Sequence, residues 1–93
     1  MTELVDNAAQ RRFEMTVDGA VAFVEYAPRA GNTLELIHTE VPQALSSRGI
    51  GSRLAQAVLE HARGRGAGVI PTCEFMAAYV ARHPEFRDLL RQP

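Results

Sequence analysis

Hydrophobic and polar residues alternate along the first part of the chain, which is the pattern of a strand that buries one face. The apolar members of this segment are Phe13, Met15 and Val17, and polar residues stand between and before them. Asp18-Gly19 follows directly, and this dipeptide is a strong signal for the turn of a β-hairpin. The pattern therefore predicts a strand over residues 12–17 that leads into a tight hairpin.

Two more strands are predicted after this turn. Residues 20–27 are apolar at nearly every position, which indicates an inner strand covered on both faces. Residues 28–32 contain proline, glycine and asparagine and predict a second turn. Residues 33–41 then predict a third strand, with His38 on the same face as Leu36. The three strands form an antiparallel meander.

The hydrophobic period changes to that of a helix after Pro42. Apolar residues recur at helical spacing, and the stretch 64–66 contains two glycines that favour the end of a helix. The members of this apolar stripe are Leu54, Ala55, Val58, Leu59 and Ala62. Residues 68–72 predict a short strand, and Thr72 or Cys73 caps a second helix. Pro84 ends that helix near residue 83 and opens a last short helix through Leu90.

The order of these elements defines the fold class. A strand, a helix and a further strand form a right-handed crossover, so the fourth strand runs parallel to the third. We therefore expect an α+β (α/β) fold, with three antiparallel strands, then an α-β-α unit, and helices packed on a mixed twisted sheet. Residues 1–93 form a single domain, and residues 1–10, which have no clear period, are expected to be a loose lead-in.

Composition excludes several functional classes. The formal net charge is -1, which gives no electrostatic drive toward nucleic acid or an anionic membrane surface. The single cysteine excludes an internal disulfide or a multi-cysteine zinc site, and the three histidines form no ligand motif, so no metal is expected. Nothing near residue 1 resembles a signal peptide, and the apolar runs are too short to span a bilayer. We expect a cytoplasmic protein that is a monomer or a weak homodimer.

A glycine-containing loop lies between the third predicted strand and the helix that carries this apolar stripe. Its sequence is Ser46-Ser47-Arg48-Gly49-Ile50-Gly51-Ser52. Two glycines allow a tight turn, and the free N–H groups at a helix start favour an anion such as a diphosphate. All ten basic residues are arginine, so a nucleotide P-loop, which needs a lysine, is excluded. Taken alone, the same residues also fit a plain strand-to-helix turn.

The longer pattern around this loop resembles a known family. The stretch from Val41-Pro42 through Arg48-Gly49-Ile50-Gly51-Ser52-Arg53-Leu54 to Ala62-Arg63 looks like the acyl-CoA-binding segment of the GNAT superfamily of N-acetyltransferases. The later stretch Val69-Ile70-Pro71-Thr72-Cys73-Glu74-Phe75 is similar to a short, single-domain branch of that superfamily. The resemblance covers about residues 13–90. It departs from the superfamily pattern at Ser46, where glutamine or arginine is usual.

The resemblance implies a minimal GNAT-like fold that binds acetyl-CoA as its cosubstrate. The implied pyrophosphate-binding residues are Arg48, Gly49, Ile50, Gly51 and Ser52. The pantetheine arm would lie in a gap between the third and fourth strands and pair with the main chain near Thr39 and Val41. Because Ser46 lacks the usual cationic or amide side chain, Arg48 or Arg53 would compensate, or the affinity would be lower.

The candidate catalytic residues are Cys73, His38 and Tyr79. Cys73 lies where a strand meets a helix N-terminus, a position that makes a thiolate more available. It would act as a nucleophile or protonate the departing CoA sulfur; a lone cysteine is otherwise a small buried apolar residue. His38 would act as a general base or orient Cys73, if both face one gap.

Other readings of the catalytic residues remain open. Glu35 and Glu40 are rival bases on the strand of His38. The resemblance implies that Tyr79 protonates the leaving thiolate, whereas the residue type alone equally fits a core aromatic.

The leading hypothesis is an acetyl-CoA-dependent N-acetyltransferase acting on an amine, either a small molecule or a protein. The alternative from another class is a non-catalytic acyl-CoA-binding or protein-interaction module on the same fold. Hydrolysis of an acyl-CoA thioester through Cys73 is a third reading.

Overall fold

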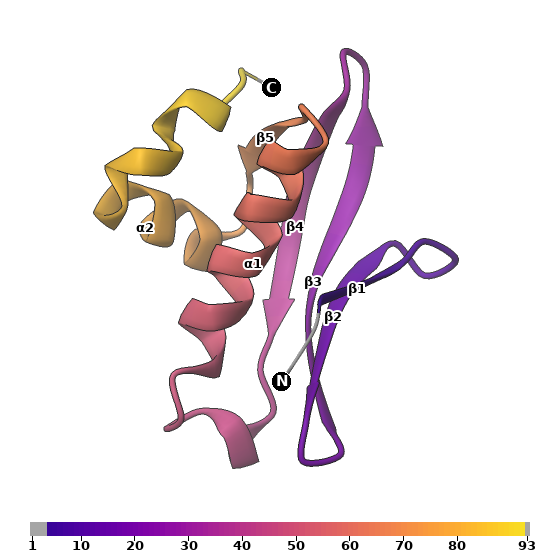
Figure 1. Cartoon of the computed structure of the whole chain (residues 1–93), viewed down its shortest axis with the longest axis vertical. Coiled ribbons are helices and arrows are strands. Elements are labelled where there is room, and N and C mark those ends of the chain that lie inside the picture. Colours follow the sequence, from indigo (N-terminus) through magenta and orange to yellow (C-terminus); the bar gives the residue numbers. More distant parts are fainter. Residues whose placement is uncertain (1–3, 93) are drawn as a thin grey trace.

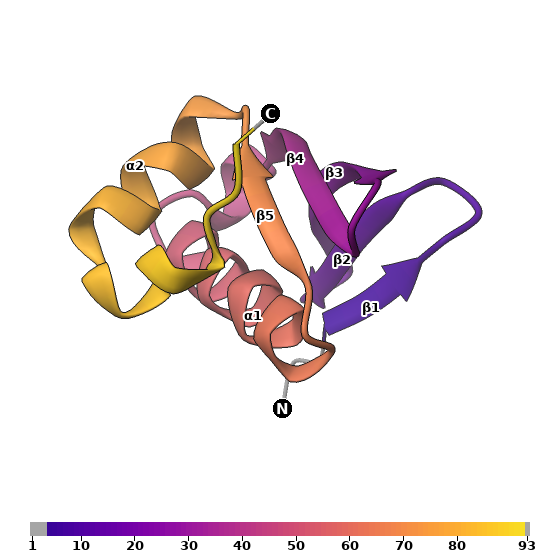
Figure 2. The same cartoon turned by 90° about the horizontal axis from the view of Figure 1, so that it is seen from above.

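The molecule has two layers, a five-stranded sheet and a pair of α-helices packed on one of its faces (Figures 1 and 2). The computed structural model describes residues 4–92. Strands β1 to β4 pair antiparallel in sequence order, and β5 runs parallel to β4. The α+β class and the mixed sheet are therefore confirmed. The elements are β1 (Leu4–Asn7), β2 (Arg12–Val17), β3 (Ala20–Arg29), β4 (Thr33–Glu40), the 3₁₀ helix η1 (Gln43–Leu45), α1 (Ile50–Gly64), β5 (Gly68–Pro71), α2 (Glu74–Arg82) and the 3₁₀ helix η2 (Pro84–Leu89).

Strand β1 lies in the segment that was expected to be a loose lead-in. That expectation is wrong for Leu4–Asn7, which pairs with β2 from Leu4↔Met15 to Asn7↔Arg12. The strand has no alternating pattern, and it is held by its backbone bonds to β2 and by polar side-chain contacts, of which the shortest involves Asp6. In that contact the hydroxyl of Tyr26 donates a 2.6 Å hydrogen bond to Asp6. Residues 1–3 of the same expectation lie outside the described residues.

Strand β3 was expected to be covered on both faces, and it is covered on one. Ala22 and Val24 are buried toward the helices, whereas Val21 on the other face is 38% exposed. Both α-helices lie on the same side of the sheet, so the opposite face is open (Figure 2). There the guanidinium of Arg12 covers the ring of Phe23 at 4.2 Å from its centroid. On the open face of β3, the apolar ring of Phe23 is thus shielded from solvent in part by the side chain of Arg12 and not by a second layer of structure.

Helix α1 buries the apolar stripe that the sequence predicts. All five of its members are fully buried, and they form the core together with the inward residues of β2, β3 and β4. The helix ends at Gly64, and Gly66 follows with a left-handed φ of 69°. This ending matches the glycine signal in the sequence. The stripe therefore fixes which side of α1 faces the sheet.

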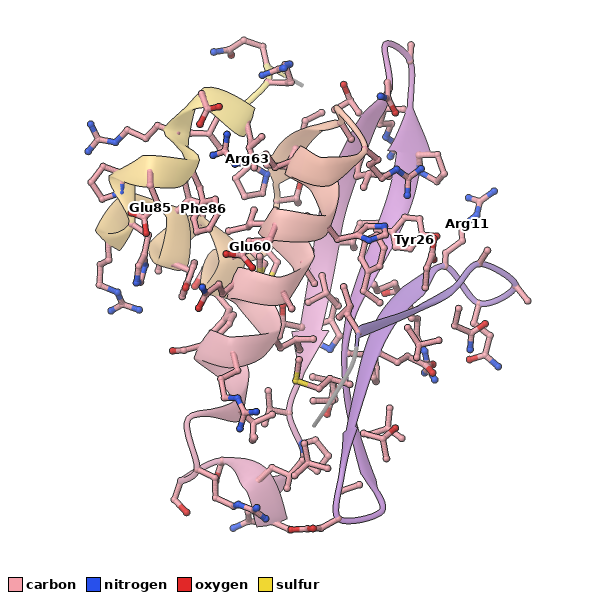
Figure 3. All side chains as sticks on the ribbon, in the orientation of Figure 1. Arg11, Tyr26, Glu60, Arg63, Glu85 and Phe86 are labelled. Carbon is pink, nitrogen blue, oxygen red and sulfur yellow. The ribbon has the colours of Figure 1, made fainter. Side chains whose placement is uncertain are left out.

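The last helix is the 3₁₀ helix η2, and it does not include Leu90. Arg63 of α1 holds it in place, since its guanidinium donates to both carboxylate oxygens of Asp88 and to the carbonyl of Glu85. The same guanidinium lies 5.7 Å from the ring centroid of Phe86 (Figure 3). The C-terminal segment is thus tied to α1 from outside the apolar core.

Candidate functional site: the gap between β4 and β5

The sheet opens where β4 and β5 stop pairing. Their parallel register ends at Leu36↔Pro71, although β4 continues to Glu40. Just beyond, the backbone N–H of Cys73 donates a 2.9 Å hydrogen bond to the carbonyl of Leu36, and the chain enters α2. The second half of β4 therefore lies beside the start of α2 and not beside β5. This is the gap that the family resemblance implies.

A β-bulge decides which side chains of β4 enter the gap. Strand β3 pairs Glu25 with His38 and Tyr26 with Leu36, so Ile37 is one extra residue on β4. An extra residue shifts the alternation of side chains by one position beyond it. The face predicted for the end of β4 from simple alternation is therefore reversed.

Thr39 takes the place that was predicted for His38. Its hydroxyl lies 3.3 Å from the sulfur of Cys73 in a partly buried contact. His38 is on the open face of the sheet, where its ring is 6.4 Å from that of Phe23. Its Nε2 lies 2.8 Å from a carboxylate oxygen of Glu40. The expectation that His38 and Cys73 face one gap is wrong, because the bulge turns His38 away.

A groove of about 330 Å³ runs from this contact toward the start of α1. The ring of Phe75, in the first turn of α2, covers Gly51 so closely that a Cβ at Gly51 would lie 2.9 Å from the Cζ atom. The ring is still 38% exposed. The groove is therefore bounded by β4, by α1 and by an aromatic side chain of α2. Its lining residues are Thr39, Val41, Ser46, Gly51 and Phe75.

The start of α1 offers backbone donors at the other end of the groove. Gly49 is the N-cap with a left-handed φ of 70°, which a glycine adopts at little cost. The N–H groups of residues 50–52 have no partner within the helix, because they belong to its first turn. The first turn carries no acidic residue, and no side chain in the described part of the chain caps it. The positive end of the helix is thus open to an anion.

Two polar side chains of the loop have other partners. The guanidinium of Arg48 donates a 2.6 Å hydrogen bond to Asp18 of the β2–β3 hairpin. The hydroxyl of Ser46 donates to the carbonyl of Gln43 at 2.9 Å. The candidate anion site at α1 therefore consists of backbone N–H groups, and the side chain of Arg48 is held in an exposed ion pair with Asp18.

Tyr79 lies away from the gap. It follows Cys73 by six residues, which is about 9 Å along a helix axis and a different helix face. The residue is buried, and its ring stacks on His83 at 3.9 Å between centroids. Burial, followed by the negative charges of Glu85 on η2 and Glu60 on α1, raises the pKa of Tyr79 (Figure 3). These charged neighbours belong to the α1–η2 side of the molecule.

Glu35, one of the two rival bases, is already engaged. The hydroxyl of Thr72 donates to it at 2.6 Å, and Nε of Arg29 donates at 2.9 Å. These two hydrogen bonds, that from Thr72 first, lower the pKa of Glu35. A carboxylate that holds its proton less tightly is a weaker base, so the arrangement disfavours Glu35 as a proton acceptor.

Phe75 is the groove residue that the sequence did not reveal. It belongs to the motif around Cys73, but a single aromatic residue at a helix start carries no signal of its own. Of the predicted site residues, the structure brings Thr39, Val41 and Gly51 to one groove, and Cys73 contacts Thr39 beside it. It places His38, Tyr79 and the side chain of Arg48 elsewhere.

Two further findings concern the described residues only. Within residues 4–92, no three His, Cys, Asp or Glu side chains gather as metal ligands. None of the helices in that range is long and apolar enough to cross a membrane.

The mixed five-stranded sheet that splits between β4 and β5, with its helices packed on it, defines a GNAT-like fold. The profile of the family described as GCN5-related N-acetyl-transferase matches residues 12–89. The chain therefore belongs to the GCN5-related N-acetyltransferase family, as the sequence resemblance predicts.

Particular relatives support the same family. Protein NATD1 of Xenopus tropicalis is 33% identical over 79 residues, which cover 81% of this chain and 71% of that protein. Human Protein NATD1 is 35% identical over 81 residues, which cover 81% of this chain and 70% of that protein. A GCN5-like protein from Staphylococcus aureus, solved by NMR, matches with a TM-score of 0.73 and 26% identity, over 98% of this chain and 89% of that one.

Proposed function

We propose that the protein is an acetyl-CoA-dependent N-acetyltransferase that uses Cys73 at the thioester. The observation that carries this proposal is a single groove with different chemistry at its two ends. One end has the Thr39–Cys73 contact at 3.3 Å, and the other has the open N-terminus of α1. A thioester and a pyrophosphate are two groups of acetyl-CoA, joined by the pantetheine arm, that need such partners.

The residues around the groove fit acetyl-CoA as a cosubstrate. The N–H groups of residues 50–52 would bind the pyrophosphate with the help of the helix dipole. The main chain of Thr39 and Val41 would pair with the pantetheine arm, since β5 does not pair with this half of β4. Because Arg48 is held by Asp18, we assign most of the phosphate binding to the backbone.

Two routes for Cys73 are chemically balanced. In the first, its thiolate forms a bond to the acetyl carbon, the bond to the CoA sulfur breaks, and CoA leaves and takes up a proton. A neutral amine then attacks the acetyl-cysteine and releases the thiol. In the second route the amine attacks acetyl-CoA directly, and the Cys73 thiol gives its proton to the departing CoA sulfur.

His38 would serve the acceptor from the open face of the sheet. Glu40, as a carboxylate, can only accept a hydrogen bond, so the 2.8 Å contact requires a proton on Nε2. In the neutral ring Nδ1 then carries a lone pair and can take a proton from an incoming ammonium group. Cys73 and His38 would act from opposite faces. We assign Tyr79 to the packing of α2 against η2.

Intact-mass spectrometry and CoA release test this function together. The protein is mixed with acetyl-CoA, with and without a panel of amines. We expect saturable binding, amine-dependent CoA release, and loss of release in Cys73→Ser. An added acetyl group that is absent in Cys73→Ser supports the covalent route. Absence of acetyl-CoA binding at millimolar concentration would contradict the proposal as a whole.

A non-catalytic acyl-CoA-binding module is the second candidate. The observation that favours it is the position of His38, which the bulge keeps away from the Cys73 thiol. This candidate predicts acetyl-CoA binding without CoA release for every amine in the panel. Release that falls in a His38→Asn variant would argue against it.

A further inference from the structure

The side chain of Thr39 has a role separate from that of its main chain. Its hydroxyl oxygen lies 3.3 Å from the sulfur of Cys73, and it is the one side-chain hydrogen-bond partner that the described residues give this thiol. We propose that Thr39 is a positioning residue, which donates a hydrogen bond to the Cys73 thiolate and holds it toward the groove. The use of that thiolate in acetyl transfer rests on the function proposed above.

The fold brings these two groups together with little freedom. The bulge at Ile37 turns Thr39 toward the helices, and the hydrogen bond from the N–H of Cys73 to Leu36 fixes the start of α2 against β4. Threonine is stiff about χ1, since its Cβ is branched. The hydroxyl and the sulfur are therefore held by one backbone contact and one restricted rotamer.

The chemistry of the pair sets the direction of the hydrogen bond. A hydroxyl has one donor and can also accept, whereas a thiolate can only accept. Once the thiol of Cys73 has lost its proton to solvent, Thr39 must be the donor. A threonine hydroxyl is too weak a base to take that proton itself at neutral pH, so its role is to orient and stabilise the sulfur.

Alkylation of Cys73 by iodoacetamide, without any CoA, tests the role of Thr39. In this reaction the sulfur bonds to carbon and iodide leaves, so the rate reports the amount of thiolate and its nucleophilicity, without any contribution from CoA binding. Loss of a hydrogen bond to a charged group lowers the ratio of thiolate to thiol about tenfold. Each remaining thiolate is more nucleophilic without that bond, so the alkylation rate falls by less than the amount of thiolate does. For Thr39→Val we expect alkylation about threefold slower at neutral pH, with the pH profile moved to higher pH.

Three further variants complete the test. Thr39→Ser keeps the hydroxyl and is expected to retain the wild-type rate and pH profile. Thr16→Val, the same change at an exposed site on β2, is the matched control and should also leave both unchanged. Thr39→Ala replaces Thr39→Val if the latter fails to fold. A wild-type rate and profile in the variant that lacks the hydroxyl would overturn the proposal, and so would an equal change in Thr16→Val.

Acetyl-CoA supplies the second readout, which separates this proposal from the function. If the protein releases CoA, Thr39→Val should lower kcat more than it raises KM, because the hydroxyl acts on the reacting sulfur. If no CoA release is found but alkylation still depends on Thr39, the positioning role stands and the transferase function fails. If CoA release occurs while the alkylation rate does not change in Thr39→Val, the function stands and the positioning role is wrong.

Discussion

At the scale of single residues, the hydroxyl of Tyr26 links the first strand to the body of the sheet. The residue is 5% exposed, stacks on Phe13 at 4.3 Å between centroids, and donates a 2.6 Å hydrogen bond to Asp6 of β1. Burial first, and then the bond to Asp6, raise the pKa of Tyr26 to about 12. One polar atom thus gives a short strand a specific partner (Figure 3).

Replacing Tyr26 with phenylalanine tests this link. We expect a loss of about 1 kcal/mol in the free energy of unfolding, since the ring packing remains and one hydrogen bond to a carboxylate is lost. The wild-type protein should also lose stability as the pH rises from about 10 toward 12, because the neutral hydroxyl is favoured in the folded state. Denaturant unfolding should show a smaller alkaline loss in Tyr26→Phe. Equal alkaline slopes in the two proteins would contradict this account.

The reversal at the end of β4 also belongs to the residue scale. Alternation places His38 on the face of Leu36, and nothing in the residue types around Ile37 signals a bulge. The bulge arises from the pairing of β4 with β3, at Glu25 and Tyr26, which a local pattern does not contain. The sequence therefore places His38 in the gap beside Cys73, where the structure has Thr39.

At the scale of elements, the contact of α1 with α2 shapes the groove. Gly51 in the first turn of α1 has Phe75 of α2 directly over it, with Val41 also within van der Waals distance of a built Cβ, at 3.7 Å. The sequence suggests that Gly51 leaves room for a ligand, whereas in the structure the ring of Phe75 uses that room. The two elements are thus matched by one glycine and one aromatic side chain.

A double-mutant cycle tests whether Gly51 leaves room for the ligand or for the ring of Phe75. An added methyl group displaces the end of the Phe75 ring and narrows the groove, so Gly51→Ala should weaken acetyl-CoA binding about tenfold, or 1.4 kcal/mol. In a Phe75→Ala background the same change should have little effect, since the clash is gone. Affinities of the four proteins are measured by calorimetry. Equal weakening in both backgrounds would mean that the methyl group meets the ligand itself.

Element prediction from the sequence succeeds where a period is strong. The stripe of α1, the Asp18-Gly19 turn and the parallel pairing of β5 all follow from local pattern or general topology rules. Strand β1 does not, because four residues without alternation carry no period and gain their structure from β2. The sequence predicts burial on both faces of β3 and the structure shows it on one, because the layer that covers a strand depends on where the helices pack.

At the scale of the whole molecule, the two faces of the sheet have different chemistry. The helix face carries the core, the groove and Cys73. The open face carries exposed polar residues, including His38 and Glu40, whose side chains are 55% and 58% exposed. Beyond Leu36↔Pro71 the sheet is open between β4 and β5, so this gap connects its two faces. We infer that acetyl-CoA approaches from the helix face and the amine from the open face.

The central claim is that acetyl-CoA occupies the groove between β4 and the start of α1. The most direct measurement is a titration of isotopically labelled protein with acetyl-CoA, followed by the nitrogen–proton correlation spectrum of its backbone amides. We predict saturable shifts in residues 49–52, 39–41 and 73–75, with β1 nearly unchanged. Absence of saturable shifts would contradict the claim. So would shifts gathered instead at the apolar groove between α2 and η2, which is lined by Pro71, Ala77, Val80, Ala81, Arg87 and Leu90.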